Sequence, residues 1–136
     1  MQTKAKNPGR ILVIDDERSA LTLLDRVLSG AGHEVALVDR GEAALQKLAK
    51  ERFDLVIADK NLPDLDGLEV VRMARGLYPH LQCILITGFP TPETKETAKV
   101  LGIHAYVTKP FGILEIVSAC DDAIAASRGN AQAARS

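Results

Sequence analysis

Side chains that could carry chemistry follow four short apolar runs of this chain. They are Asp15, Asp16 and Glu17 after the first run, Asp59 after the second, Thr87 with Gly88 after the third, and Lys109 with Pro110 after the fourth. Carboxylates held a few ångströms apart repel one another, which raises their pKa values unless a cation joins them. Oxygen ligands at a site open to water suit Mg²⁺, which keeps several of its waters and often bridges to a phosphate. The acids therefore predict a Mg²⁺ site.

Asp59 could act as a nucleophile as well as a metal ligand, because carboxylates form covalent acyl phosphates. Phosphoryl transfer requires in-line positioning and neutralisation of the equatorial oxygens of the transferred group. Mg²⁺ could hold one of these oxygens, Lys109 a second, and the Thr87 hydroxyl with a backbone N–H a third. Gly88 would leave room beside Thr87 for the incoming group. These residue types together predict a phosphoryl-transfer site.

The four apolar runs must be strands of one sheet if the residues that follow them are to meet. Apolar runs predict strands over 11–14, 34–38, 54–58, 83–86 and 105–108. Helical spacing predicts helices over 19–28, 41–50, 91–101 and 111–126, and a further helix that Asp66 caps and that ends before Pro79. Five strands that are each followed by a helix indicate an α/β fold with a parallel sheet covered on both faces. Ligands of such sheets bind beyond the carboxyl ends of the strands, where the candidate residues lie.

In this order and at these strand ends, four motifs resemble those of the receiver domain of two-component response regulators, of the chemotaxis-Y-like kind. The motifs are Asp15-Asp16, Asp59-Lys60-Asn61-Leu62-Pro63 with Gly67, Thr87-Gly88, and Tyr106-Val107-Thr108-Lys109-Pro110-Phe111. The resemblance extends over residues 10–128. It implies a flavodoxin-like (βα)5 doubly wound fold with a five-stranded parallel sheet in the order 2-1-3-4-5.

The resemblance implies a role for each residue of the metal site. Asp59 matches the phosphoacceptor, Asp16 the direct metal ligand, and Asp15 the acid that usually holds the metal through water. Asn61 matches the position whose backbone carbonyl completes the site, so its side chain is not required there. The implied metal is Mg²⁺, with Mn²⁺ as the alternative.

The resemblance also implies how the phosphoryl group is sensed. Thr87 and Lys109 match the phosphate-sensing pair, with Gly88 beside the bound phosphate. Tyr106 matches an aromatic switch that turns inward when the Thr87 hydroxyl moves to the phosphate. On the residues alone, Tyr106 could instead be a packed side chain of an edge strand. The family commonly has a cis peptide bond before the residue that matches Pro110.

A receiver domain is a signalling switch that catalyses only its own phosphorylation and dephosphorylation. We expect a sensor histidine kinase or a histidine phosphotransfer protein to donate the phosphoryl group. The surface formed by residues 91–101, 105–108 and 111–126 would then favour a different output partner or domain. The same surface is a candidate homodimer interface.

Two other classes of function stay open at this point. A phosphatase or phosphotransferase would use Asp59 as a transient nucleophile, but related aspartyl phosphatases place a proton-donating acid where this chain has Asn61. A binding module would act without phosphorylation. Asp15 and Asp16 could also simply cap the helix that follows them.

Composition limits the other possibilities. The chain has 136 residues, 46% of them hydrophobic, and a net charge of -1, which suits one globular domain without a strong attraction to nucleic acid or membranes. Cys83 and Cys120 lie in apolar surroundings, and no apolar stretch follows the basic N-terminus, so we expect reduced thiols and a cytoplasmic protein. We expect a flexible segment over 1–9, the receiver domain over 10–128, and a disordered tail or the start of a linker over 129–136.

Overall fold

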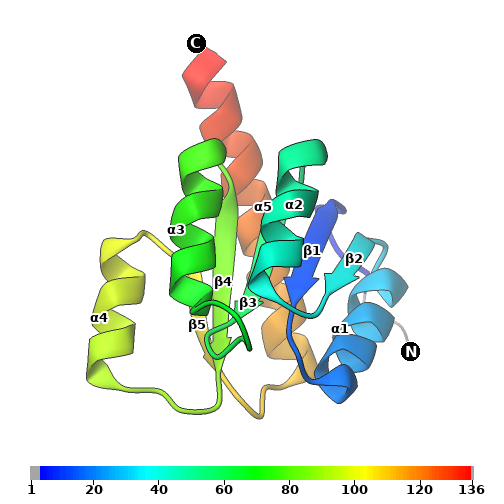
Figure 1. Ribbon diagram of the computed structural model, residues 1–136. Coiled ribbons are helices and arrows are strands. Elements are labelled where there is room, and N and C mark those ends of the chain that lie inside the picture. The colour runs from blue at the N-terminus through cyan, green and yellow to red at the C-terminus, as the bar shows by residue number, and fades with distance from the viewer. Residues whose placement is uncertain (1–3, 136) are drawn as a thin grey trace.

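A computed structural model describes residues 4–135 of the chain, and the side chains of residues 4–129. Strands and helices alternate throughout (Figure 1). The elements are β1 (Arg10–Ile14), α1 (Arg18–Gly30), β2 (Glu34–Val38), α2 (Gly41–Lys50), β3 (Leu55–Asp59), α3 (Gly67–Leu77), β4 (Gln82–Thr87), α4 (Pro92–Val100), β5 (Ala105–Thr108) and α5 (Ile113–Arg135).

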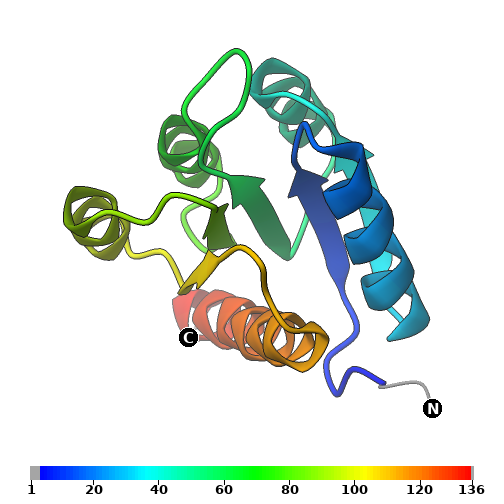
Figure 2. The same cartoon turned by 90° about the horizontal axis from the view of Figure 1, so that it is seen from below.

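The five strands form one parallel sheet in the order β2-β1-β3-β4-β5, which confirms the predicted fold class and strand order. Ile14 of β1 pairs with Ala58 of β3, and Asp59 of β3 pairs with Ile86 of β4. This register aligns the carboxyl ends of the three central strands. Figure 2 is viewed from this edge, where the loops after β1, β3, β4 and β5 lie side by side. The fold thus brings the candidate residues to one edge.

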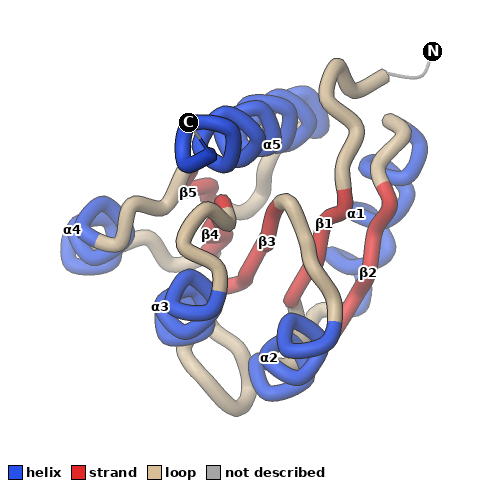
Figure 3. The backbone as a smooth tube through the Cα atoms, turned by 90° about the horizontal axis from the view of Figure 1, so that it is seen from above, coloured by secondary structure: helices blue, strands red, loops and turns tan. Residues whose placement is uncertain are grey.

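Alternation along the strands divides the core into two layers. In β1, Ile11 and Val13 pack with apolar residues of α1 and α5, whereas Leu12 and Ile14 pack with those of α2 and α3. Figure 3 shows the corresponding arrangement, with α1 and α5 on one face of the sheet and α2 and α3 on the other. Because both faces are covered, the central strands are apolar along almost their whole length.

Helix α4 lies apart from these two layers, beside the β4–β5 end of the sheet (Figures 1 and 3). Thr91 caps it by accepting a hydrogen bond from the Thr94 backbone N–H. Only Thr94 and Ala98 of this helix are buried, as the sparse apolar residues of the segment lead one to expect. The C-terminal end is held by Arg75 of α3, which donates to the carbonyl oxygens of Leu101 (2.7 Å) and Gly102 (2.9 Å).

The structure describes most of both ends of the chain. Residues 1–3 lie outside the described part, but residues 5–9 are tied to the domain: the Ala5 N–H donates to Ala31, and the Asn7 N–H donates to Asp121. Helix α5 continues to Arg135, through the segment for which we expected a disordered tail or the start of a linker. This segment is rich in alanine, which has the highest helix propensity, although it lacks an apolar period.

Two further observations concern the whole described chain. Cys83 and Cys120 are free and buried, as expected, and burial raises the pKa of each thiol to about 12. No helix within residues 4–135 has both the length and the apolar character needed to cross a membrane.

Candidate active site

Two buried carboxylates face each other at the carboxyl edge of the sheet. Asp59 is the last residue of β3 and is 5% exposed, and Asp15 directly follows β1 and is 1% exposed. Each of them accepts a backbone hydrogen bond from the residue two positions later: Asp59 from Asn61 (2.8 Å) and Asp15 from Glu17 (2.9 Å). The strand ends and these local bonds therefore fix both carboxylates.

Lys109 supplies the positive charge that these acids need. It follows β5, and its Nζ lies 2.7 Å from Asp59 Oδ2, 2.9 Å from Asp15 Oδ2 and 2.6 Å from Glu17 Oε1. The Lys109 backbone N–H donates to the Thr87 carbonyl oxygen (2.8 Å), and the peptide bond between Lys109 and Pro110 is cis. The ammonium group therefore uses its three donors on three carboxylates, two from the loop after β1 and one from the end of β3.

The pKa values follow from this crowding. Burial raises the pKa of Asp15 above its ordinary value, although the Glu17 backbone N–H and Lys109 act in the opposite direction. Burial lowers the pKa of Lys109, but its hydrogen bonds to Asp59, Glu17 and Asp15 outweigh burial and leave that pKa raised. Lys109 is therefore a permanent cation among these acids.

Glu17, rather than Asp16, completes the acidic group. One oxygen from each of Asp15, Glu17 and Asp59 lies within 4.8 Å of the others, an arrangement of hard ligands that could hold a metal ion. Asp16 is exposed and does not belong to this group. The reason is local: the hydrogen bond from the Glu17 N–H to Asp15 turns the chain so that Glu17 lies over the cluster. The sequence places Glu17 with the acids that follow the first strand, but the family resemblance implied a role for Asp15 and Asp16 only.

The loop between β3 and α3 is held close to Asp59. The Gly67 N–H donates to the Lys60 carbonyl oxygen (2.8 Å), and Lys60 Nζ lies 2.7 Å from Asp66 Oδ2. Asn61 is exposed, and the contact that it makes with Asp59 is through its backbone N–H. At the far end of the loop, Asp64 accepts hydrogen bonds from two backbone N–H groups at the start of α2.

Thr87 is the last residue of β4 and is fully buried. Its hydroxyl oxygen accepts a hydrogen bond from the Phe89 backbone N–H (3.0 Å). The exposed Gly88 lies between them, and a Cβ atom there would meet no other atom within 4 Å. The structure therefore places Thr87 at the same edge as the acidic group, with open space at Gly88 as the sequence led us to expect.

Tyr106 lies on β5, in the middle of the segment before Lys109, and is half-buried. Its hydroxyl is buried and has no hydrogen-bond partner among the described residues. Lys95 of α4 lies over its ring, with Nζ 5.9 Å from the centroid. The Tyr106 ring thus lies beside Lys95 of α4, and its buried hydroxyl, unpaired among the described residues, costs free energy.

Comparison with known proteins identifies the family. The response regulator receiver domain family matches residues 11–121. The response regulator protein FleR of Pseudomonas aeruginosa is 37% identical over 113 residues, which cover 81% of this chain and 24% of that protein. The alkaline phosphatase synthesis transcriptional regulatory protein PhoP of Bacillus subtilis is 37% identical over 107 residues, which cover 79% of this chain and 45% of that protein. The chain therefore spans less than half the length of either relative.

Solved structures agree with this assignment. A CheY-like response regulator receiver domain protein from Methanospirillum hungatei superposes with a TM-score of 0.86 at 27% identity, covering 90% of this chain and 98% of that one. The chemotaxis response regulator CheY4 of Vibrio cholerae superposes with a TM-score of 0.79 at 30% identity, covering 85% of this chain and 98% of that one. With its parallel sheet and its acids and lysine gathered at the carboxyl edge, the chain belongs to the response regulator receiver domain family.

Proposed function

We propose that Asp59 accepts a phosphoryl group from a phosphohistidine of a sensor histidine kinase or a histidine phosphotransfer protein. The observation that carries this proposal is the 2.7 Å contact between Asp59 Oδ2 and Lys109 Nζ at the carboxyl edge of the sheet. It supplies a buried carboxylate with a fixed cation beside the oxygen that would attack.

In the proposed reaction, a carboxylate oxygen of Asp59 forms a bond to phosphorus as the bond between phosphorus and the histidine nitrogen breaks. The electron pair of that bond stays on the imidazole of the donor protein. Lys109 remains beside Asp59 and neutralises an oxygen of the transferred group, as a compact ammonium can. Hydrolysis of the acyl phosphate by water would return Asp59 to its carboxylate form. The domain is in this view a switch that catalyses only its own phosphorylation and dephosphorylation.

The acidic group fits the divalent cation that this chemistry requires, because it offers three carboxylates, and among the described residues Lys109 is the one cation that contacts all three. The ligands that we propose are Asp15, Asp59, the backbone carbonyl of Asn61 and Asp16, whose exposed carboxylate would have to turn toward the cluster. Glu17 is a further carboxylate within that cluster. Mg²⁺, or Mn²⁺ in its place, would when bound offset the negative charge of the phosphoryl oxygens. Lys109 would then lose its ion pairs with Asp15 and Glu17 and retain the one with Asp59.

We also propose that Thr87 and Tyr106 report the phosphorylation. The Thr87 hydroxyl would turn from the Phe89 N–H to the phosphoryl group, with Gly88 leaving the space for it. Tyr106, whose hydroxyl has no hydrogen-bond partner among the described residues, would adjust to the vacated volume. Helix α4 has little buried surface, so it is the element that such a change would move at the lowest cost.

The α4-β5-α5 surface would then favour a different output partner or domain. The relatives FleR and PhoP are named a response regulator and a transcriptional regulator, and both are longer than this chain. We propose that output depends on a protein or domain bound to this surface, and that this domain itself contacts neither nucleic acid nor membrane. Homodimerisation through the same surface is one form that the output could take.

Phosphorylation can be tested with the whole chain, Mg²⁺ and acetyl phosphate, followed by intact-mass measurement. We expect one added phosphoryl group, none when the metal is removed by a chelator, and none on Asp59→Asn. Asn is close in shape to Asp and keeps an acceptor oxygen for the Asn61 N–H, so this variant should fold. Equal phosphorylation of Asp59→Asn and the unchanged protein would contradict the proposal.

A further inference from the structure

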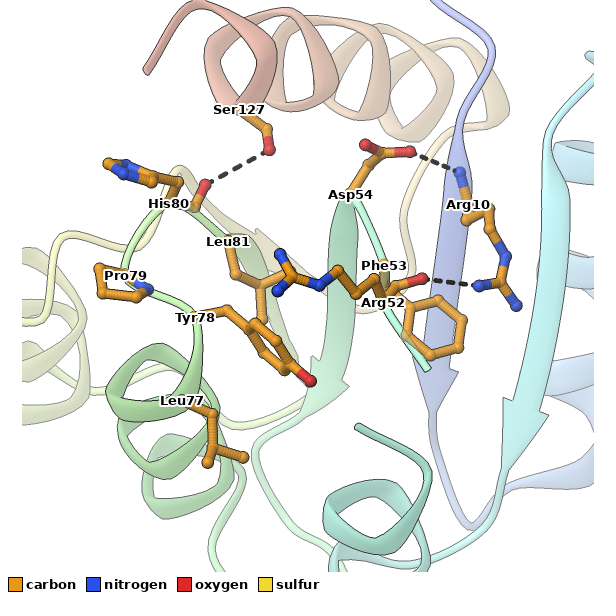
Figure 4. Close-up of a pocket in the computed structure, with 10 residues that line it drawn as sticks. All are labelled: Arg10, Arg52, Phe53, Asp54, Leu77, Tyr78, Pro79, His80, Leu81 and Ser127. Carbon is orange, nitrogen blue, oxygen red and sulfur yellow. Dashed lines mark hydrogen bonds between the residues drawn. The ribbon is translucent and has the colours of Figure 1, made fainter. Parts of the chain in front are cut away.

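A pocket of about 540 Å³ opens at the amino edge of the sheet, at the opposite end of β3 from Asp59. Its walls come from the start of β1, the α2–β3 loop, the α3–β4 loop and α5, which Figure 3 shows gathered at this edge. Six of the residues that line it are Arg10, Arg52, Asp54, Leu77, Tyr78 and Leu81, which Figure 4 draws as sticks. The volume lies within the range of small-molecule sites, about 300–1,000 Å³.

Most polar groups around this pocket already have partners. The Arg10 guanidinium donates to the Arg52 carbonyl oxygen (2.7 Å) and pairs with Glu51 (2.7 Å) and Glu34 (2.9 Å). Asp54 accepts a hydrogen bond from the Arg10 backbone N–H (2.8 Å; Figure 4). These groups therefore build the wall and leave little capacity to bind a ligand.

The Arg52 guanidinium differs from its neighbours. It lies over the Tyr78 ring, 5.3 Å from the centroid, and points toward Tyr78 and Leu81 within the pocket (Figure 4). Within the side chains that the structure describes, we find no carboxylate paired with it and no acceptor for its N–H groups. Leu77, which also lines the pocket and lies beyond Tyr78 from Arg52 in Figure 4, is 55% exposed. The pocket thus presents an unpaired planar cation beside an apolar and aromatic wall.

We propose that this pocket binds a small aromatic carboxylate. A carboxylate matches the fork of guanidinium N–H donors and can form two parallel charge-assisted hydrogen bonds with Arg52. The aromatic body of the ligand would cover Leu77 and Tyr78, which removes apolar surface from water. A cation would be repelled by Arg52, and a neutral ligand would gain only the apolar contact. The site lies away from Asp59, so binding does not depend on phosphorylation.

The test is a titration of the isotopically labelled whole chain with 3-phenylpropionate, followed by backbone amide NMR. We expect saturating shifts of the amides of residues 52–54, 77–78 and 80–81, with a dissociation constant below about 10 mM, as suits a ligand of this size. Arg52→Gln should weaken binding about tenfold or more, the usual effect of losing a hydrogen bond to a charged group. Propionate, which lacks the ring, and 3-phenylpropanol, which lacks the charge, should each bind more weakly.

Arg40→Gln is the matched control, because Arg40 is also an exposed arginine but precedes α2 at the other edge of the sheet. It should bind 3-phenylpropionate like the unchanged protein, and so should Asp59→Asn. The NMR spectrum itself shows whether each variant is folded. Shifts that do not saturate, an unchanged affinity in Arg52→Gln, or equal binding of 3-phenylpropanol would each overturn the proposal.

Discussion

A Cβ atom on Gly67 would lie 2.1 Å from the carbonyl oxygen of Asp59, far inside any real contact. The first residue of α3 therefore packs directly against the backbone of the last residue of β3. The Gly67 N–H completes the contact by donating to Lys60. This close approach holds the loop that carries Asn61 against the strand end.

Gly67→Ala should consequently destabilise the domain. The added methyl group must displace backbone atoms, and overpacking of this kind costs about 1–3 kcal/mol or more of the free energy of unfolding. Gly76→Ala, near the end of the same helix, is the matched control, because a Cβ atom there meets nothing within 4 Å. It should stabilise the domain by about 0.5–1 kcal/mol. Urea unfolding of both variants measures the difference, and equal effects would contradict the close packing at Gly67.

The sequence predicts the fold well because the central strands are apolar runs with a helix after each. The positions of Asp59 and Thr87 at strand ends follow from the same pattern, and the structure confirms them. The sequence places Glu17 among the acids at this edge but does not predict that Glu17 rather than Asp16 joins Asp15, because that depends on a single backbone hydrogen bond. Nor does it predict that α5 reaches Arg135, because an alanine-rich segment forms a helix without an apolar period.

Lys109→Met should tighten the binding of Mg²⁺ to the acidic group. Lys109 Nζ contacts Asp15, Glu17 and Asp59, so it competes with a metal ion for the same oxygens. One unit charge about 4 Å away contributes up to about 4 kcal/mol at an effective dielectric constant of 20, and the lysine of the unchanged protein can move aside to recover much of this. We therefore expect the dissociation constant, measured by calorimetry, to fall roughly tenfold.

Lys95→Met is the control for Lys109→Met. Lys95 lies over the Tyr106 ring, and the structure shows no contact between it and Asp15, Glu17 or Asp59. It should leave the affinity for Mg²⁺ unchanged. If Lys109→Met bound Mg²⁺ as weakly as the unchanged protein, or more weakly, the three carboxylates would not be the metal site.

Arg75→Ala should loosen the C-terminal end of α4. The Arg75 guanidinium holds the carbonyl oxygens of Leu101 and Gly102, and hydrogen bonds to a charged group contribute about 1.5–3 kcal/mol each. We expect faster amide hydrogen exchange over 94–102 with little change in the central strands. Arg72→Ala, which removes an exposed ion pair with Glu69 on the same helix, should change exchange far less. Equal amide hydrogen exchange over 94–102 in both variants would argue that the Arg75 hydrogen bonds do not hold this end of α4.

His33 should make the stability of the domain depend on pH. Its Nδ1 accepts a hydrogen bond from the Gly9 N–H (3.1 Å), and burial lowers the pKa of His33 below its usual 6.5. The unfolded chain then takes up a proton more readily than the folded one, so the free energy of unfolding falls as the pH drops through 6.5 toward the lowered pKa and is constant above that range. His33→Gln should lack this decrease, whereas the exposed His80→Gln should keep it. Denaturant unfolding between pH 5 and 8 compares them, and an unaltered decrease in His33→Gln would refute the assignment.

The central claim is that Asp59 is the residue that forms the acyl phosphate. Borohydride reduces an aspartyl phosphate to homoserine, which peptide mass spectrometry can locate in the chain. After incubation with Mg²⁺ and acetyl phosphate, we expect homoserine at position 59 and at no other position. Homoserine at position 15 or 16, or none at 59 in a protein that has gained a phosphoryl group, would contradict the account.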